Sequence, residues 1–387
     1  MKVLVVSEVF PPAIGGSGEL LRNVYVRMRT AEARVLAGLL EDGVVSTSQD
    51  GPLTVLRAPM QTLQWGLRHG GLRHHWHEAR RIRRHAAGSG TVVHVARVLP
   101  EGVGAWLASQ FGGPRYVCWA HGEDVASAST SRELAWLMRR VFAGASAVLA
   151  NSHNTARMVA AVGVPAAKTV VVHPGVDASR FEHPDAAAVA RFRARLAPGN
   201  EMVVLIVGRL QRRKGHDLLV EALGRLRAAG RAVRAVVVGD GEERPRIEAL
   251  VRERGLTEAV TLAGSVPAGD LPLYYAAADI FCHPNRIDGH DVEGFGIVFL
   301  EAAAAGLPVI GGNSGGVPEA IAADVTGLLV SGTDAEELTA AIARLTDDPS
   351  LRSAMGRAGR DRVRREFSWE RAAALVERVQ TDILARR

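Results

Sequence analysis

Two glutamates, Glu293 and Glu301, stand eight positions apart in the stretch DGHDVEGFGIVFLE. Gly294 and Gly296 disfavour a regular helix at the first glutamate, whereas the apolar residues 297–305 predict a buried helix. We therefore expect Glu293 in a loop at a helix start and Glu301 inside the helix. Eight helical residues span about 12 Å, and the carboxylates of a retaining glycosidase stand only about 5 Å apart. The spacing suits acids that bind different parts of one long ligand, such as a nucleotide sugar.

A basic segment, GRLQRRKG at residues 208–215, lies between an apolar strand pattern and a helical pattern. Arginine offers a planar fork of donors and lysine a point charge. Both stabilise the negative charge that builds on the phosphates when a nucleoside diphosphate leaves a sugar. The alternative is that these basic side chains are simply solvated.

His121 follows the apolar segment 116–120 and opens the sequence HGED. A residue in that place lies at the carboxyl edge of a parallel sheet, where open α/β folds bind ligands. His121 is therefore a candidate for substrate contact, and Glu123 and Asp124 are weaker candidates. The alternative is a structural histidine that is held by hydrogen bonds.

The first loop has the composition of a phosphate-binding turn. Residues 2–7 predict a strand, residues 8–17 a loop that contains Gly15 and Gly16, and residues 18–29 a helix. Free backbone N–H groups and the dipole at a helix start attract an anion, and a missing Cβ lets the anion approach. The pattern is neither G-x-G-x-x-G nor Walker A, so a plain strand-to-helix turn is the alternative.

Strand patterns alternate with helical patterns along the whole chain, which predicts parallel sheets with helices on both faces. A chain of 387 residues is too long for one ordinary core and fits two domains. The pattern breaks at residues 173–177 and restarts near residue 202. Expected strands cover residues 2–7, 34–36, 53–57, 91–96, 116–120, 145–151, 169–172, 202–207, 233–238, 260–262 and 280–283. Expected helices cover 18–29, 68–84, 152–162, 216–229, 244–254, 271–276, 297–305 and the tail 352–387.

The composition is that of a soluble globular protein, with 47% apolar and 23% charged residues. Only two cysteines occur, Cys118 and Cys282, which suits a reducing cytosol and offers no disulfide or metal framework. The sequence shows neither an apolar run of about 18 residues nor a signal peptide, so we expect a cytoplasmic protein. The net charge of +6 favours anionic partners, and no motif supports nucleic acid.

Residues 68–84 carry six arginines and several histidines against one acid, Glu78, with Leu72 and Trp76 interleaved. Such a basic amphipathic helix can lie on an anionic membrane surface, which would place the protein on the inner membrane face. Because its apolar positions are sparse, an ordinary solvated face is the alternative.

The Glu-x7-Glu pattern with its Gly-Phe-Gly interior resembles the motif of retaining glycosyltransferases of family GT4. The text DVEGFGIVFLEAAAAGLPVIGGNSGGVPEAI is most similar to the branch that contains bacterial phosphatidylinositol mannoside mannosyltransferases. The resemblance implies the GT-B fold, in which two Rossmann-like domains with parallel sheets face a central cleft. It implies an acceptor domain at residues 1–174, a nucleotide-sugar donor domain at 175–365 and a helix at 366–387 that returns to the first domain.

The resemblance also implies roles for the two acids. Glu293 would bind hydroxyls of the donor sugar, supported by the backbone amides of Phe295, Gly296 and Ile297. Glu301 would accept hydrogen bonds from the ribose hydroxyls.

The same resemblance assigns the groups around the diphosphate. Arg209 and Lys214 match the cationic pair of the family and, with Gly15 and the amide of Gly16, would hold the leaving diphosphate. His121 would steady the sugar as it gains oxocarbenium character. The remaining donor contacts are a turn at Gly239 and the backbone of Ser265 and Val266. Arg212 and Arg213 receive no role.

We expect a hexosyl transfer from GDP-mannose or a UDP-hexose to an acceptor hydroxyl. Family members retain the anomeric configuration, and no carboxylate is placed as a covalent nucleophile, which favours attack on the face that the diphosphate leaves. The chain contains no D-x-D metal motif, so we predict that no metal or other cofactor is needed. The acceptor is either a small metabolite or a lipid-linked polyol.

Other functions fit the same architecture. A nucleotide-sugar epimerase or a non-catalytic nucleotide-sugar-binding protein are the alternatives, and a phosphorylase would need a pyridoxal lysine that nothing indicates. A non-catalytic protein would more readily have lost Arg209, Lys214 or one of the glutamates, and all are present.

Overall fold

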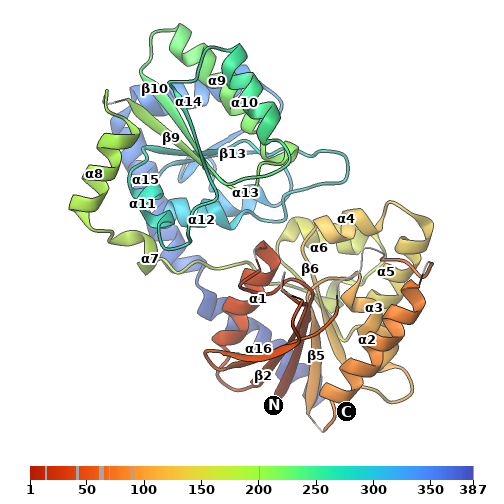
Figure 1. Cartoon of the computed structure of the whole chain (residues 1–387). Coiled ribbons are helices and arrows are strands. Elements are labelled where there is room, and N and C mark those ends of the chain that lie inside the picture. Colours follow the sequence, from red (N-terminus) through yellow and green to blue (C-terminus); the bar gives the residue numbers. More distant parts are fainter. Residues whose placement is uncertain are drawn as a thin grey trace. The chain divides into compact units, whose positions relative to one another are not determined.

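The structure is a computed structural model that describes residues 1–13, 15–40, 43–60, 65–68, 70–88, 90–199 and 201–386. The chain divides into two compact units. Unit 1 comprises residues 1–175 and 369–387, and unit 2 comprises residues 176–368. Each unit is one sheet with helices packed against it (Figure 1). The predicted α/β class with parallel sheets is confirmed.

The sheet of unit 1 has the strand order β3-β4-β2-β1-β5-β6-β7-β8. All neighbours are parallel except β3 and β4, which form an antiparallel hairpin at the edge. The strands are β1 (Lys2–Ser7), β2 (Glu32–Ala37), β3 (Ser46–Asp50), β4 (Leu53–Arg57), β5 (Thr91–Val95), β6 (Tyr116–Ala120), β7 (Ala147–Ala150) and β8 (Thr169–Val171). The sequence analysis missed β3, because its residues STSQD are polar and mostly exposed.

Helices cover both faces of this sheet. On one face lie α1 (Gly16–Val26) and α16 (Trp369–Ala385), which pack against each other. The other face carries α2 (Gly71–His85), α3 (Glu101–Ser109) and α5 (Arg132–Gly144), in that order side by side (Figure 1). The short helices α4 (Glu123–Ala128) and α6 (His153–Ala161) follow β6 and β7.

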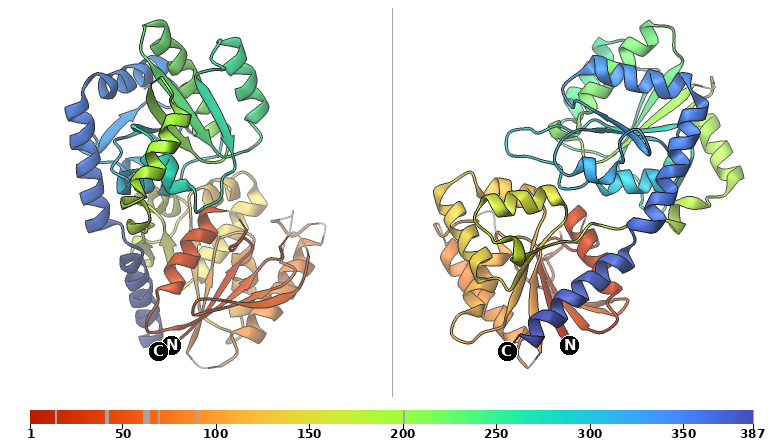
Figure 2. Two further views of the ribbon diagram at one scale, coloured as in Figure 1. Left: turned by 60° about the vertical axis from the view of Figure 1, so that its left-hand side comes forward. Right: turned by 180° about the vertical axis from the view of Figure 1, so that it is seen from behind.

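A buried chain of hydrogen bonds ties α16 to the sheet of unit 1. Trp119 Nε1 donates to Tyr25 Oη at 3.0 Å, and Tyr25 Oη lies 2.7 Å from His94 Nδ1. His94 Nε2 lies 2.8 Å from Gln380 Oε1, and Gln380 Nε2 donates to the carbonyl of Lys2 at 2.9 Å. The two ends of the chain consequently lie at the same edge of unit 1 (Figure 2).

The sheet of unit 2 is wholly parallel, in the order β11-β10-β9-β12-β13-β14. Its strands are β9 (Met202–Val207), β10 (Val233–Val238), β11 (Val260–Gly264), β12 (Ile280–His283), β13 (Val309–Gly312) and β14 (Gly327–Val330). The chain builds outward from β9 to β11 and then crosses to β12 on the other side of β9. The strand order therefore reverses between β9 and β12, and open α/β sheets bind ligands beyond the carboxyl ends of the strands at such a point.

Alternate residues of β9 show why this sheet is covered on both sides. Val204 and Ile206 pack into one apolar core, and Val203, Leu205 and Val207 pack into the other. A strand with both faces buried is read as a continuous apolar run, here MVVLIV.

The helices of unit 2 are α7 (Ser179–Glu182), α8 (Ala186–Leu196), α9 (His216–Ala228), α10 (Arg244–Glu253), α11 (Leu271–Ala276), α12 (Ile297–Ala304), α13 (Val317–Ala320), α14 (Ala335–Asp347) and α15 (Pro349–Glu366). The tail that was expected as one helical region is two helices, α15 and α16, because the chain leaves the helical conformation at Phe367. Cys118 and Cys282 are both buried and free. Among the described helices, none is long and apolar enough to span a bilayer.

Candidate functional site

The loop between β12 and α12 carries Glu293, as predicted, and α12 itself carries Glu301. Gly296 caps α12 in the left-handed region, with φ 90°. A Cβ at Gly296 would lie 2.7 Å from a ring carbon of Phe299, so both the backbone conformation and the packing require glycine. Because the helix begins at this turn, Glu293 lies in the loop before it and Glu301 lies within the helix.

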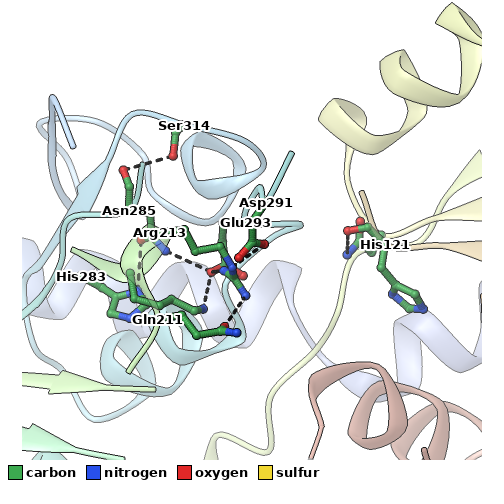
Figure 3. Close-up of polar contacts among 10 residues, drawn as sticks. His121, Gln211, Arg213, His283, Asn285, Asp291, Glu293 and Ser314 are labelled. Atoms are coloured by element: carbon green, nitrogen blue, oxygen red, sulfur yellow. Dashed lines mark hydrogen bonds and ion pairs between the residues drawn. The ribbon is translucent and has the colours of Figure 1, made fainter. Parts of the chain in front are cut away.

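Three donors converge on one oxygen of Glu293 (Figure 3). Its Oε2 accepts hydrogen bonds from Arg213 Nη1 at 2.6 Å, from Asn285 Nδ2 at 3.0 Å and from Lys214 Nζ. Within the described part of the chain, no residue donates a hydrogen bond to Oε1. The carboxylate is thus anchored through one oxygen, and the other is left for a ligand.

Glu293 is ionised although its side chain is only 12% exposed. Burial favours the neutral form, but the charges of Lys214 and Arg213 outweigh burial and hold the pKa of Glu293 far below its usual range. A permanently charged carboxylate accepts hydrogen bonds without giving up a proton. Glu293 is therefore suited to accept hydrogen bonds and has no proton to give as a general acid.

Arg213, to which the sequence gave no role, is one of the cations that contact Glu293. It lies on the short turn η2 (Arg212–Lys214) after β9, is 9% exposed, and its Nε stands 2.7 Å from Asp291 Oδ1. Its neighbour Arg212 is 61% exposed at the side chain and stands 3.7 Å from Asp288. In a pair of adjacent arginines, nothing in the residue pattern tells which one turns inward.

The two expected cations of this loop have different surroundings. Lys214 is buried against Glu293, as described above. Arg209 directly follows Gly208 at the end of β9, and its side chain is exposed. Among the residues that the structure describes, none forms a hydrogen bond or an ion pair with the Arg209 side chain, so the structure brings Lys214 and Glu293 together and leaves the Arg209 guanidinium outside that group.

Glu301 has a separate environment. Its Oε2 accepts a hydrogen bond of 2.7 Å from the hydroxyl of Tyr275, whose ring is fully buried at the end of α11. Burial and the nearby carboxylate raise the pKa of Tyr275 well above its usual value, so the phenol stays a donor. Glu301 itself is half-buried.

The other donor-side residues lie at or beyond the carboxyl edge of the sheet. Gly239 follows β10 with φ 130°, and a Cβ there would stand 2.1 Å from the carbonyl of Gly208. Ser265 is exposed after β11, and Val266 is half-buried against the core. Of two further predicted residues, Phe295 lies in the loop before α12 with its ring against Phe367, and Ile297 is the first residue of the helix.

Among the described residues, no side chain caps the N-terminus of α1 in unit 1. Gly15 caps this helix without any side-chain hydrogen bond, and Gly16 is exposed with no heavy atom within 4 Å of where its Cβ would lie. The first-turn amides of a helix have no partner inside the helix. They suit the anion contact that was expected of Gly15 and Gly16.

His121 lies after β6, with its ring stacked on Trp119 at a centroid distance of 6.2 Å. Its Nε2 stands 2.8 Å from the carbonyl of Ala96, so this nitrogen carries the proton and Nδ1 is an acceptor in the neutral ring. Burial lowers the pKa of His121 despite the opposing charge of Asp124, whose carboxylate also accepts a hydrogen bond from the His121 backbone. A neutral, rigidly held imidazole results.

Most of the basic segment of residues 68–84 forms α2, which ends at His85. His69 lies outside the described residues. The inner face of α2 buries His75, Glu78 and Ile82. Leu72 and Trp76 are 57% and 52% exposed on the outer face. Burial raises the pKa of Glu78 to about 7, with Arg81 opposing the shift.

Family models match most of the chain. The model described as glycosyl transferases group 1 matches residues 190–362, and the model described as glycosyltransferase family 4 matches residues 42–180. Both halves of the chain therefore match models of glycosyltransferases.

Two curated relatives are similar over long stretches. A GDP-mannose-dependent alpha-(1-6)-phosphatidylinositol monomannoside mannosyltransferase of Mycobacterium tuberculosis is 39% identical over 281 residues, covering 71% of this chain and 72% of that protein. A GDP-mannose-dependent monoacylated alpha-(1-6)-phosphatidylinositol monomannoside mannosyltransferase of Corynebacterium glutamicum is 31% identical and covers 95% of both chains.

Solved structures share the fold. HepE of Anabaena, in complex with UDP, has a TM-score of 0.81 at 21% identity and covers 99% of this chain and 100% of its own. Sucrose-phosphate synthase of Thermosynechococcus elongatus has a TM-score of 0.83 at 24% identity and covers 100% of both chains.

Proposed function

This chain belongs to glycosyltransferase family 4 and has the GT-B fold, and from that premise we propose that it transfers mannose from GDP-mannose to an inositol-containing lipid. Enzymes of this kind use nucleotide sugars. The relatives with long matches carry GDP-mannose and a phosphatidylinositol mannoside in their names. The single observation that carries the proposal is the carboxylate of Glu293, which is charged, anchored through Oε2 and open at Oε1.

Glu293 binds the donor sugar in this proposal. Oε1 accepts hydrogen bonds from sugar hydroxyls, and the amides of Phe295, Gly296 and Ile297 at the start of α12 add donors beside it. Glu301 accepts from the ribose, and Tyr275 holds its other oxygen in place. The nucleoside and sugar ends of the donor are thus recognised by different carboxylates.

The departing diphosphate is stabilised by cations and amides. A lysine ammonium has three N–H donors, so Lys214 can bind a phosphate oxygen while it keeps its contact with Glu293. Arg209 is exposed and has no competing partner among the described residues, which leaves its guanidinium available for the diphosphate. The backbones of Ser265 and Val266 and the turn at Gly239 border the base, and the open amide of Gly16, with Gly15, adds a donor for phosphate.

We propose that the sugar keeps its anomeric configuration. The bond from the anomeric carbon to the phosphate oxygen breaks as the acceptor oxygen bonds to the same face, and a leaving phosphate oxygen takes the acceptor proton. Neutral His121 steadies the sugar as its charge grows, because its unprotonated Nδ1 can accept a hydrogen bond. We also propose a metal-independent reaction, because Lys214 and Arg209 can neutralise the charge on the diphosphate and the sequence has no D-x-D motif.

Product analysis tests this function. The purified protein is incubated with GDP-mannose and an equal mixture of phosphatidylinositol, its monomannoside and D-inositol 3-phosphate, with and without EDTA. We expect a mannosylated lipid, with the donor's anomeric configuration in its NMR spectrum and a yield unaffected by EDTA. Curated relatives also include D-inositol 3-phosphate glycosyltransferases, one of them 40% identical over 210 residues. Mannosylation of the soluble inositol phosphate alone would contradict the lipid acceptor, and an inverted product would contradict the stereochemistry.

We also propose that the outer face of α2 contacts an anionic membrane surface. Exposed Leu72 and Trp76 stand among arginines, and Arg80 lies over the Trp76 ring at 5.6 Å. On the same side of the sheet, α5 exposes Trp136 beneath Arg140 at 5.3 Å. Aromatic side chains suit the bilayer interface, and arginines suit anionic headgroups.

Vesicle flotation tests the membrane contact. Wild-type protein should float with vesicles that contain phosphatidylinositol and not with neutral phosphatidylcholine vesicles. The double substitution Leu72→Ser with Trp76→Ser should abolish flotation, and the matched change Val325→Ser, at an exposed apolar residue of unit 2, should not. Equal flotation of wild type with both kinds of vesicle would overturn the contact.

A further inference from the structure

A second layer of polar side chains lies behind Glu293 (Figure 3). His283 Nδ1 stands 3.1 Å from Asn285 Oδ1, and Asn285 Nδ2 donates to Glu293 Oε2 at 3.0 Å. Both His283 and Asn285 are completely buried at the end of β12. None of these buried contacts involves a residue to which the sequence motifs gave a role, apart from Glu293 itself.

The charge on Glu293 determines which atoms donate in the hydrogen bonds from His283 through Asn285 to Glu293. An ionised carboxylate only accepts hydrogen bonds, so Asn285 must turn its NH2 group to Glu293 and its carbonyl to His283. His283 must then donate from Nδ1. Burial and the charge of Lys214 lower the pKa of His283 well below its usual value, so its Nε2 carries no proton. In the described part of the chain, Nε2 has no hydrogen-bond partner. His283 is therefore neutral, with its single N–H used to hold Asn285.

The backbone around Asn285 leaves little freedom. A Cβ on Gly312 would stand 1.8 Å from the carbonyl oxygen of Asn285, and that oxygen also accepts a hydrogen bond of 3.1 Å from Ser314. A Cβ on Gly208 would stand 3.2 Å from His283 Nε2, so the ring is closely covered as well. With the backbone fixed, the remaining choice is which end of the Asn285 amide faces Glu293.

We propose that His283 is a positioning residue for donor binding: its Nδ1–H selects the amide orientation of Asn285, which fixes Glu293 so that Oε1 meets the sugar. This inference rests on the proposed role of Glu293. Without the His283 donor, a turned amide would set Asn285 Oδ1 against Glu293 Oε2, and two acceptors repel each other. Glu293 would then lose one of its three anchors.

Two substitutions separate positioning from packing. In His283→Asn, the side-chain NH2 group can take the place of Nδ1–H, whereas in His283→Gln the longer side chain carries its NH2 group near the place of Nε2. We expect His283→Gln to weaken GDP-mannose binding about tenfold or more, with GDP binding unchanged, and His283→Asn to recover most of the loss. Packing alone predicts the opposite order, because glutamine fills more of the ring's volume.

Calorimetric titration of GDP-mannose and of GDP into each variant gives these affinities, and thermal unfolding shows that each variant is folded. Equal affinities in wild type and both variants, or a smaller loss in His283→Gln than in His283→Asn, would overturn the positioning role. If Glu293→Gln still turns over normally, the proposed function fails instead. If neither His283 variant folds, the imidazole 15N spectrum of the unmodified protein decides, since a proton on Nε2 would contradict the inference.

Discussion

The two units differ in how their candidate residues are held. In unit 2, Glu293, Lys214, Arg213 and Asn285 come from two separate loops and contact one another directly. In unit 1, the imidazole of His121 is held by the carbonyl of Ala96, and Gly16 is the first residue of α1. The contacts within unit 2 thus join its candidate residues to one another, whereas the imidazole of His121 in unit 1 is fixed by a backbone carbonyl.

The difference follows from strand order and from charge. The loops after β9 and β12 meet because the sheet of unit 2 reverses its strand order between these strands. One loop supplies cations and the other a carboxylate, so burial itself brings them together: a charge leaves water only with a partner. Unit 1 also pairs charges beyond its strands, because Arg97 lies 3.2 Å from Glu8 and 3.5 Å from Glu101, but the imidazole of His121 is held by the carbonyl of Ala96.

The largest effect is expected at Lys214. Lys214→Met removes the buried ammonium and should lower kcat about 100-fold or more, because a fixed cation no longer meets the charge that develops on the diphosphate. Steady-state transfer from GDP-mannose measures it, with the exposed Lys2→Met as the matched control. A decrease in kcat of less than about threefold would show that Lys214 does not stabilise the leaving diphosphate.

Substitutions of Arg213 and Arg212 test how much the ion pairs around Glu293 contribute to the stability of the fold. Arg213→Ala leaves the buried Glu293 with one cation fewer and Asp291 without its ion pair to Arg213, and should lower the free energy of unfolding by about 3 kcal/mol. Arg212→Ala at the exposed neighbour should change it by less than about 0.5 kcal/mol. Urea denaturation of both variants makes the comparison, and equal effects would refute the distinction between them.

In unit 1, His94 gives a prediction of pH dependence. Burial lowers the pKa of His94 to about 4, against about 6.5 in an unfolded chain, so the unfolded state binds the proton first as pH falls. The contribution to stability is full above about pH 6.5 and lost as pH falls towards 4, by about 3 kcal/mol in total. His94→Phe should flatten this part of the pH profile of unfolding, whereas His77→Phe at an exposed position should not.

The smallest effect is expected at Tyr275. Tyr275→Phe removes one hydrogen bond to Glu301 and should weaken GDP binding about fivefold, corresponding to about 1 kcal/mol. The same loss should appear with GDP-mannose, because Glu301 is assigned to the ribose. A loss of affinity for GDP-mannose alone would indicate that Glu301 binds the sugar. It would contradict the proposal that Glu293 and Glu301 bind different ends of the donor.

The sequence was informative about elements and less so about side chains. Apolar runs such as MVVLIV predicted strands at their observed places, and glycines placed Glu293 in the loop before α12. The polar edge strand β3 was missed, because it has no apolar face to produce a pattern. The apolar pattern shows where each strand ends, and ligands of open α/β sheets bind beyond the carboxyl ends of the strands, so candidate residues could be sought there.

The sequence could not supply the partners of Glu293. Arg213 turns inward and Arg212 outward on one short turn, a difference that depends on the fold around them. Asn285 and His283 lie in the unremarkable text FCHPN, and only the crossing of the chain to β12 puts them behind the carboxylate. Contacts between distant loops have no signature in local residue order.

The central claim is that Glu293 binds the donor sugar through an oxygen that the protein leaves open, and Glu293→Gln tests it most directly. Turnover and GDP affinity are measured together, with Glu253→Gln, an exposed change on α10, as the control. We predict a loss of turnover of about 100-fold or more with GDP affinity preserved, because only the sugar end loses its partner. Near-normal turnover, or an equal loss of GDP affinity, would contradict the account.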